Sequence, residues 1–207
     1  MTTLLHLNVS PRGERSTSRR AGQYLRDQLS AHHGPLTVID RDLGGDPLPV
    51  IDAAFTEANI AMAAGSGNAR ASALALSETL IAELESSDML LITTPMHNFT
   101  VPATLKTWID LVVRPARTFQ STPQGKQGLL RDRPVLAVVS CGGAFHSGPG
   151  SQMDHFTPYL KYVLGTIGLT RVEVLRMENM NRGPDQVAQG FDLLRAWCDA
   201  ALPAMAT

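Results

Sequence analysis

The chain has 207 residues, of which 43% are hydrophobic and 18% are charged, and its formal net charge is −1. This composition is typical of a globular domain with a sizeable buried core, and the balanced charge gives no reason to expect a nucleic acid or an anionic membrane as a partner. Only two cysteines are present, Cys141 and Cys198, too few for a disulfide framework or a thiolate metal site.

Apolar strand patterns and helical patterns alternate along the chain. In chain order they predict a strand at 4–9, a helix from Ser16 to the Gly34 stop, a strand at 36–39, a loop at 44–49, helices at 55–64 and 73–84, a strand at 89–92, a helix at 103–113, a hairpin within 117–130, a strand at 135–139, a helix at 159–168, a strand at 172–175 and a helix at 185–201. The alternation predicts an α/β fold, a doubly wound, five-stranded parallel sheet with helices on both faces. We find no repeat or linker and expect one domain over residues 1–207.

The connection between the second and third predicted strands is unusually long. Its helical part at 55–64 is followed by a break at Gly65-Ser66-Gly67-Asn68. A compact unit needs a much shorter connection, so we interpret residues 55–68 as a cover on the substrate side.

The first candidate site is the loop after strand 4–9, which contains Ser10 and leads to Ser16, Thr17 and Ser18 at a helix start. Hydroxyls and the unpaired N–H groups of a helix start together bind phosphate. The loop lacks both the Gly-Lys-Ser/Thr ending of a nucleoside-triphosphatase and GxGxxG, which favours a terminal monophosphate. The alternative is a plain serine cap. Four arginines nearby either favour a phosphate or form a solvated face: Arg12, Arg15, Arg19 and Arg20.

The second candidate site follows the strand at 89–92 and contains Met96, His97, Asn98 and Phe99. In open α/β sheets, ligands bind at the carboxyl ends of the strands. Asn98 can present a donor and an acceptor to a pyrimidine-like edge, and Met96 and Phe99 offer apolar surface to a flat ring. Considered singly, an Asn in a turn and a Phe in the core are the simpler interpretation.

The third candidate site follows the strand at 135–139 and contains Ser140, Cys141, Gly142 and Gly143. Paired glycines let the backbone approach a planar ligand and leave its N–H groups free to donate. A tight turn is the alternative. A nucleophilic Cys141, as in a cysteine hydrolase, is disfavoured because no His or Asp partner stands at a readable spacing.

Together these motifs resemble the FMN-dependent NADH azoreductases, also called FMN-dependent NADH:quinone oxidoreductases. The resemblance covers essentially the whole chain, in order. It is carried by Ser10 with residues 16–18, by residues 94–99, Leu105-Lys106, Asp110 and residues 140–143, and by Gly148-Pro149, residues 157–160 and residues 164–168.

The resemblance implies a flavodoxin-like fold with strand order 2-1-3-4-5. It further implies that Ser10 and residues 16–18 hold the FMN phosphate and ribityl chain, while residues 96–99 and 140–143 surround the isoalloxazine. Two positions depart from the family, which often has Tyr at His97 and Arg at Cys141; both departures bear on flavin potential and substrate preference. Family members are typically homodimers whose sites are completed by the partner chain.

The function that follows is a transfer of two electrons from NADH or NADPH to a quinone or azo compound by a ping-pong mechanism. The alternative is a flavodoxin that carries single electrons between proteins, but the ring-facing loops contain no Asp or Glu. No residue is assigned as an obligatory acid or base, since His97 is either a proton donor or a structural residue. No secretion signal or apolar run of about 20 residues is found, so we expect a cytoplasmic protein without a bound metal.

Overall fold

The computed structural model describes residues 1–65, 71–145 and 150–204; the predicted break at residues 66–68 and the Gly148-Pro149 motif lie outside them. In chain order the elements are β1 (Thr2–Asn8), the 3-10 turn η1 (Gly13–Arg15), α1 (Thr17–His33), β2 (Leu36–Asp42), α2 (Ala53–Ala63), α3 (Ala71–Ser86), β3 (Met89–Pro95), α4 (Ala103–Val112), β4 (Phe119–Thr122), β5 (Gly125–Gly128), β6 (Val135–Ser140), α5 (Phe156–Thr166), β7 (Val172–Met177) and α6 (Pro184–Ala204). None of the helices in this part of the chain is long and apolar enough to cross a membrane.

Within the described residues, five parallel strands form the central sheet in the order β2-β1-β3-β6-β7. The predicted order, 2-1-3-4-5, differs from this in the numbers of its last two strands, because the antiparallel hairpin β4–β5 takes the intervening numbers. The register places Asn8 beside Thr93 and Pro95 beside Ser140. The carboxyl ends of β1, β3 and β6 therefore meet at one edge.

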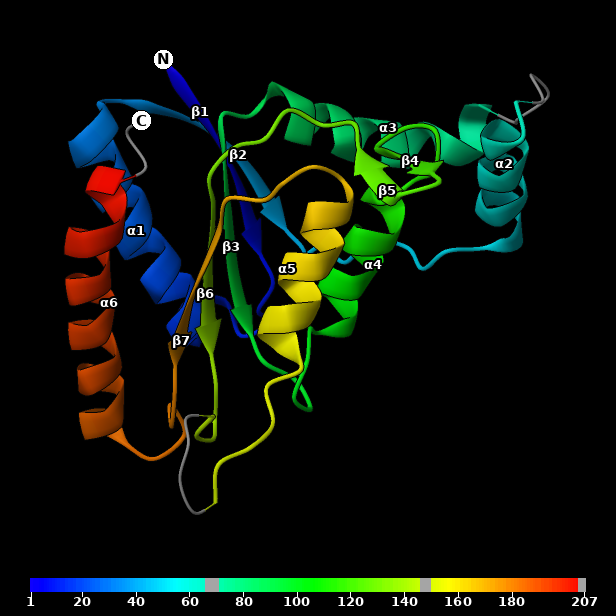
Figure 1. Cartoon of the computed structure of the whole chain (residues 1–207). Coiled ribbons are helices and arrows are strands. Elements are labelled where there is room, and N and C mark those ends of the chain that lie inside the picture. The colour runs from blue at the N-terminus through cyan, green and yellow to red at the C-terminus, as the bar shows by residue number, and fades with distance from the viewer. Residues whose placement is uncertain (66–70, 146–149, 205–207) are drawn as a thin grey trace.

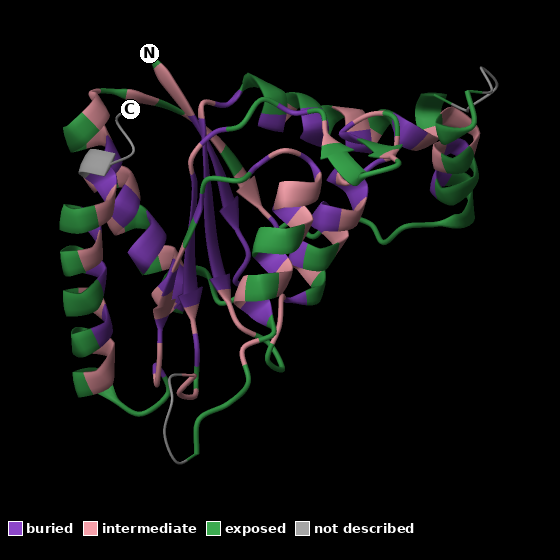
Figure 2. Ribbon diagram, viewed as in Figure 1, coloured by how far each residue is buried: buried purple, intermediate pink, exposed green. Residues whose placement is uncertain are grey.

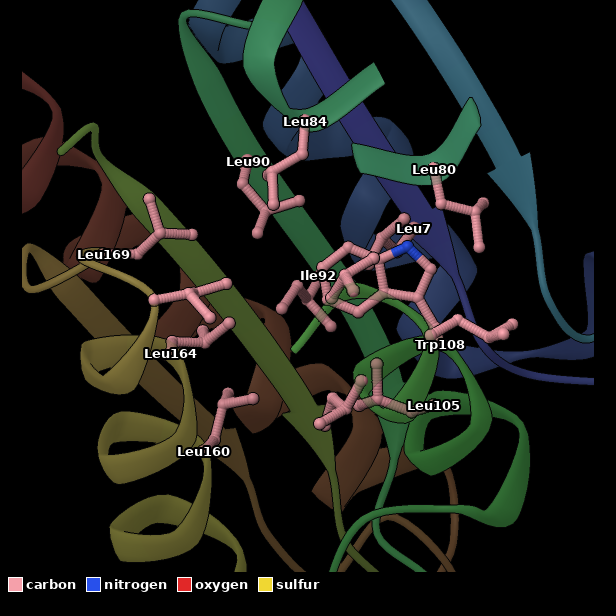
Figure 3. Packing of buried hydrophobic residues seen from close by; sticks show 14 of the residues in the cluster. Leu7, Leu80, Leu84, Leu90, Ile92, Leu105, Trp108, Leu160, Leu164 and Leu169 are labelled. Atoms are coloured by element: carbon pink, nitrogen blue, oxygen red, sulfur yellow. The ribbon is translucent and has the colours of Figure 1, made fainter. Parts of the chain in front are cut away.

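Helices cover both faces of the sheet (Figure 1). On one face, α1 and α6 pack through buried side chains such as Leu25 and Leu194. On the other face lie α3, α4 and α5, and Figure 3 shows Trp108 and Leu164 in the same cluster as Ile92 of β3. The inner strands β1, β3 and β6 are buried along most of their length (Figure 2), and each buried Leu or Ile contributes about 1.5–3 kcal/mol.

The helix α2 projects beyond the sheet and contacts α3 (Figure 1). The fully buried Arg114 holds it there, since its Nε donates to Asn59 Oδ1 of α2 at 3.2 Å and its Nη1 to Glu78 Oε1 of α3 at 2.6 Å. The expected cover on the substrate side is wrong for a single chain: α2 lies away from the carboxyl edge of the sheet (Figure 1).

Two of the predicted boundaries differ from the observed ones for reasons that the contacts of these residues explain. The strand predicted at 89–92 continues to Pro95, because the β-branched Thr93 and Thr94 are buried and stay paired with β6. The helix predicted at 159–168 begins at Phe156 and ends at Thr166. Its earlier start follows from Asp154, whose Oδ1 accepts the backbone N–H groups of Phe156 and Thr157, both at 2.9 Å.

Candidate cofactor site at the carboxyl edge of the sheet

Three loops leave the sheet side by side at this edge. The backbone N–H of Val9 donates to Thr93 O at 2.9 Å, which joins the start of the first loop to β3. The N–H of Met96 donates to Ser140 O at 2.9 Å, which joins the second loop to the third. The three predicted candidate sites, although far apart in sequence, thus begin at neighbouring strand ends on one edge of the sheet.

The first loop collects buried hydroxyls at the start of α1. Ser10, Ser16 and Ser18 are almost fully buried, and Thr17 is half-buried. Ser16 is the N-cap, where its Oγ accepts the Arg19 N–H at 3.3 Å and lies 3.0 Å from Ser18 Oγ. The first N–H groups of an α-helix have no intrahelical partner and carry the positive end of its dipole. Hydroxyls and N–H groups converge here on a site suited to an anion.

Of the four arginines near this helix start, Arg19 has a structural role. Its Nε donates to Ser10 O at 2.9 Å, and its guanidinium pairs with Asp42. Burial raises the pKa of Asp42, but hydrogen bonds from Arg19 and the Gly45 N–H outweigh it, so the net pKa is lowered. Arg20 lies over the Phe191 ring, 5.0 Å from its centroid. Arg12 and Arg15 are exposed, as a solvated face requires.

The second loop is a tight turn with backbone strain. His97 and Thr100 exchange backbone hydrogen bonds of 3.1 and 3.0 Å around two central residues of positive φ, Asn98 at 47° and Phe99 at 73°. Such a turn favours Asn followed by Gly. Phe99 therefore occupies a left-handed conformation that costs on the order of 1 kcal/mol, and strain of this kind clusters at functional sites. Its ring is 48% exposed, available to a ligand and unused by the core.

The third loop is fixed by backbone contacts to the end of β7. The N–H of Cys141 donates to Met177 O at 2.8 Å. Burial, followed by the nearby charge of Glu178, raises the pKa of the Cys141 thiol to about 12, which makes it a neutral packing group. At Gly142 an added Cβ would lie 2.6 Å from Asn181 Nδ2, and at Gly143 one would lie 2.7 Å from Gln152 Oε1. A side chain at either glycine would therefore require the flexible end of Asn181 or Gln152 to shift.

A cavity of about 320 Å³ lies between the second and third loops. Its walls include six of the predicted residues: Met96, Asn98, Phe99, Cys141, Gly142 and Gly143. Among the residues the structure describes, His97 and Ser140 flank the cavity without lining it. Three lining residues escaped the sequence analysis: Phe145, Gln152 and Asn181. Phe145 and Asn181 could have been suspected, since each follows a strand at the carboxyl edge; Gln152 carries no such signal.

Comparisons with known proteins agree with this arrangement. A family model described as having a flavodoxin-like fold matches residues 2–202. FMN-dependent NADH:quinone oxidoreductase 2 of Cupriavidus pinatubonensis is 64% identical over 197 residues, which cover 95% of this chain and 96% of the relative. FMN-dependent NADH:quinone oxidoreductase 5 of Burkholderia lata is 47% identical over 188 residues, covering 91% and 89%.

Solved structures share the fold over nearly the full length. An azoreductase from Bacillus anthracis superposes with a TM-score of 0.83 at 25% identity and covers 97% of this chain and 99% of its own. An FMN-dependent NADH-azoreductase from Bacillus anthracis, solved in complex with FMN, also superposes with a TM-score of 0.83, over 99% and 100% of the two chains. At 22% identity, this second likeness concerns the fold alone.

Proposed function

The chain belongs to the family of FMN-dependent NADH:quinone oxidoreductases, and on this premise we propose that it binds FMN and transfers two electrons from NADH to a quinone or azo compound. The electron donor is NADH or NADPH. We further propose that residues 1–207 act as one FMN-binding domain. The observation that carries the proposal is the convergence of a phosphate-suited helix start and a ring-sized cavity on one edge of the sheet.

The residues at this edge fit FMN. Ser16 and Ser18 present buried hydroxyls beside free helix N–H groups, which suits a terminal phosphate. Asn98 offers an amide to the polar edge of the ring system, and Phe99 an apolar face. Gly142 and Gly143 line the cavity without a Cβ, so their backbone can approach a planar group closely.

FMN, when bound, supplies the redox chemistry between the electron donor and the acceptor. The protein binds FMN, orients it and shields it from solvent. Cys141 remains a neutral thiol and takes no proton, and His97 is exposed at the start of the turn. We therefore assign no catalytic acid or base to this chain.

We also propose a ping-pong mechanism, in which NADH and the acceptor use the same place over the flavin ring in turn. The first product must then leave before the second substrate binds.

The carrier alternative gains one observation from the structure. Glu178, which follows β7, accepts the Phe145 N–H at 2.8 Å and so brings a carboxylate to the third loop, although the loop sequence itself contains none. Carboxylates near the ring oppose the fully reduced, anionic flavin, as a one-electron carrier requires. Arg176 pairs with both Glu178 and Asp154 and therefore offsets the charge of Glu178 only in part.

We also propose a homodimer. Val50 and Ile51 precede α2 and are 80% and 39% exposed, and Ile60 on α2 is 64% exposed. Because α2 projects from the body of the chain (Figure 1), these side chains are placed to meet a second copy, and two-fold dimers are the commonest oligomers. A fully active, stable monomer in sedimentation would refute this proposal.

The two cysteines are buried and unbridged, which suits our proposed cytoplasmic location.

The first experiment is to identify the flavin. The purified protein is denatured, and the released cofactor is chromatographed against FMN and FAD. We expect FMN, because the helix start offers a phosphate site without the glycines that make room for an adenylate half. FAD, or no flavin even after reconstitution, would overturn the proposal.

A further inference from the structure

Two charged residues at the end of β7 make hydrogen bonds to the connection between β6 and α5. Arg176 Nη1 donates to Asp154 Oδ2 at 2.6 Å, and its Nε donates to Glu178 Oε1 at 3.2 Å. The other oxygen of Glu178 accepts the backbone N–H of Phe145 at 2.8 Å. One ion-pair group thus holds the segment at both of its described ends, near Phe145 and at Asp154.

Backbone hydrogen bonds also join the residues that follow β6 to those that follow β7. The Met180 N–H donates to Cys141 O at 2.9 Å, and the Asn179 N–H donates to Gly143 O at 3.2 Å. They continue the pairing of β6 with β7 beyond the sheet, and Asn179 takes a positive φ of 61° there. This backbone pairing extends to Gly143. Two residues further along the chain, the Phe145 N–H donates to the carboxylate of Glu178.

Asp154 transmits the attachment to α5. Its Oδ1 accepts the N–H groups at the start of that helix while its Oδ2 accepts Arg176. Burial raises the pKa of Asp154, but the hydrogen bonds from Thr157 and the charge of Arg176 more than offset this, and the net pKa is lowered. Asp154 is therefore held as a carboxylate at neutral pH, as both of its contacts require.

The position of these groups relative to the cavity gives them a role. Cys141, Gly143 and Phe145 on one side of the segment, and Gln152 on the other, line the cavity. The side chains of Arg176, Asp154 and Glu178 are 28%, 16% and 10% exposed. Shielded, charge-assisted hydrogen bonds of this kind are stronger than those of surface ion pairs.

We propose that Glu178 and Arg176 are positioning residues for the flavin: they hold the two described parts of the connection between β6 and α5, at Phe145 and at residues 152–154, where these form one wall of the cavity. This inference rests on the proposed function for the identity of the ligand, but not for the contacts. Neither residue is required to touch the cofactor. Glu178 acts through the Phe145 N–H, and Arg176 acts through Asp154.

The test compares three variants. Glu178→Ala removes the acceptor of the Phe145 N–H, whereas Glu178→Gln keeps an acceptor oxygen without the charge. Glu83→Ala is the matched control, because the Arg41–Glu83 ion pair is similarly shielded, at 26% and 16% exposure, and joins β2 to α3 away from the cavity. Two quantities are measured for each: the hydrogen-exchange rate of the Phe145 amide without flavin, and the dissociation constant for FMN.

We expect Glu178→Ala to speed exchange at Phe145 and to raise the FMN dissociation constant, each by about tenfold, as for loss of one charge-assisted hydrogen bond. Glu178→Gln should restore both to within about threefold of the parent, because a neutral hydrogen bond remains. Glu83→Ala should change neither, although it lowers overall stability.

The outcomes separate this inference from the proposed function. Unchanged exchange in Glu178→Ala, or equal effects of Glu178→Ala and Glu83→Ala, overturns the positioning role. Failure of Glu178→Gln to restore the parent values overturns the assigned hydrogen bond. If the parent protein binds no FMN, the proposed function fails, and exchange at Phe145 still decides whether Glu178 holds the segment.

Discussion

Acidification should destabilise the folded chain through the buried His6. This residue is 2% exposed, its Nε2 lies 3.0 Å from Thr93 Oγ1, and its Nδ1 has no hydrogen-bond partner among the residues that the structure describes. Burial lowers the pKa of His6 from 6.5 to about 4; Asp40 partly opposes the shift, while Arg26 and Arg19 add to it. In the unfolded chain the imidazole regains its ordinary pKa and binds a proton below pH 6.5.

The sign and size of the effect follow from linkage. Between pH 6.5 and pH 4 the unfolded state binds more protons than the folded state, so the free energy of unfolding decreases as the pH falls. From pH 7 to pH 5, the two pKa values correspond to a loss of about 2 kcal/mol from His6 alone. Below pH 4 the contribution of His6 levels off, because both states are then protonated.

The assay is urea unfolding of the flavin-free protein at pH 7 and pH 5. His6→Gln removes the titration, and His97→Gln, at an exposed position, is the control for loss of a histidine. Between the two pH values the parent and His97→Gln should each lose about 2 kcal/mol more than His6→Gln. Equal losses in all three proteins would refute the argument that His6 is held neutral by burial.

Three further predictions concern the site and its scaffold. Replacing Ser16 and Ser18 together by Ala should weaken FMN by about tenfold or more and riboflavin hardly at all, because the lost contacts go to phosphate; equal weakening of both would contradict the assigned role. The Cys141 thiol, whose pKa burial raises to about 12, should resist iodoacetamide at pH 8 in the native protein, and rapid labelling would refute its neutrality. Arg114→Met should lower the free energy of unfolding by about 2 kcal/mol in urea titrations, since Asn59 and Glu78 lose the hydrogen bonds from Arg114 and Glu78 keeps only Arg117; no change would contradict the role of Arg114.

The layered fold could be predicted because the central strands β3 and β6 are mostly apolar runs. Residues 89–92 read as a doubly buried strand without ambiguity. The residues at which the helices and strands begin and end were harder to predict, because specific contacts in the folded chain decide them. The continuation of β3 to Pro95 depends on pairing with β6, and the start of α5 depends on the cap supplied by Asp154.

The candidate site shows the same division. Loops that directly follow predicted strands could be found, since the topology alone brings Ser10, Met96 and Ser140 to one edge. Gln152 reaches the cavity from a segment that Arg176 contacts through Asp154. No local pattern encodes those contacts. The position of α2 away from this edge likewise depends on the buried Arg114, which reads in the sequence as one arginine among many.

The central claim is that the bound flavin exchanges electrons in pairs with NADH and a quinone. The direct measurement is an anaerobic titration with NADH across the visible range, followed by addition of a quinone. We predict bleaching of the yellow form with nearly isosbestic spectra, full recovery of the yellow form by about one equivalent of quinone, and parallel lines in steady-state kinetics. A stable long-wavelength absorption from one-electron reduction, together with no response to NADH or NADPH, would contradict the account and identify an electron carrier instead.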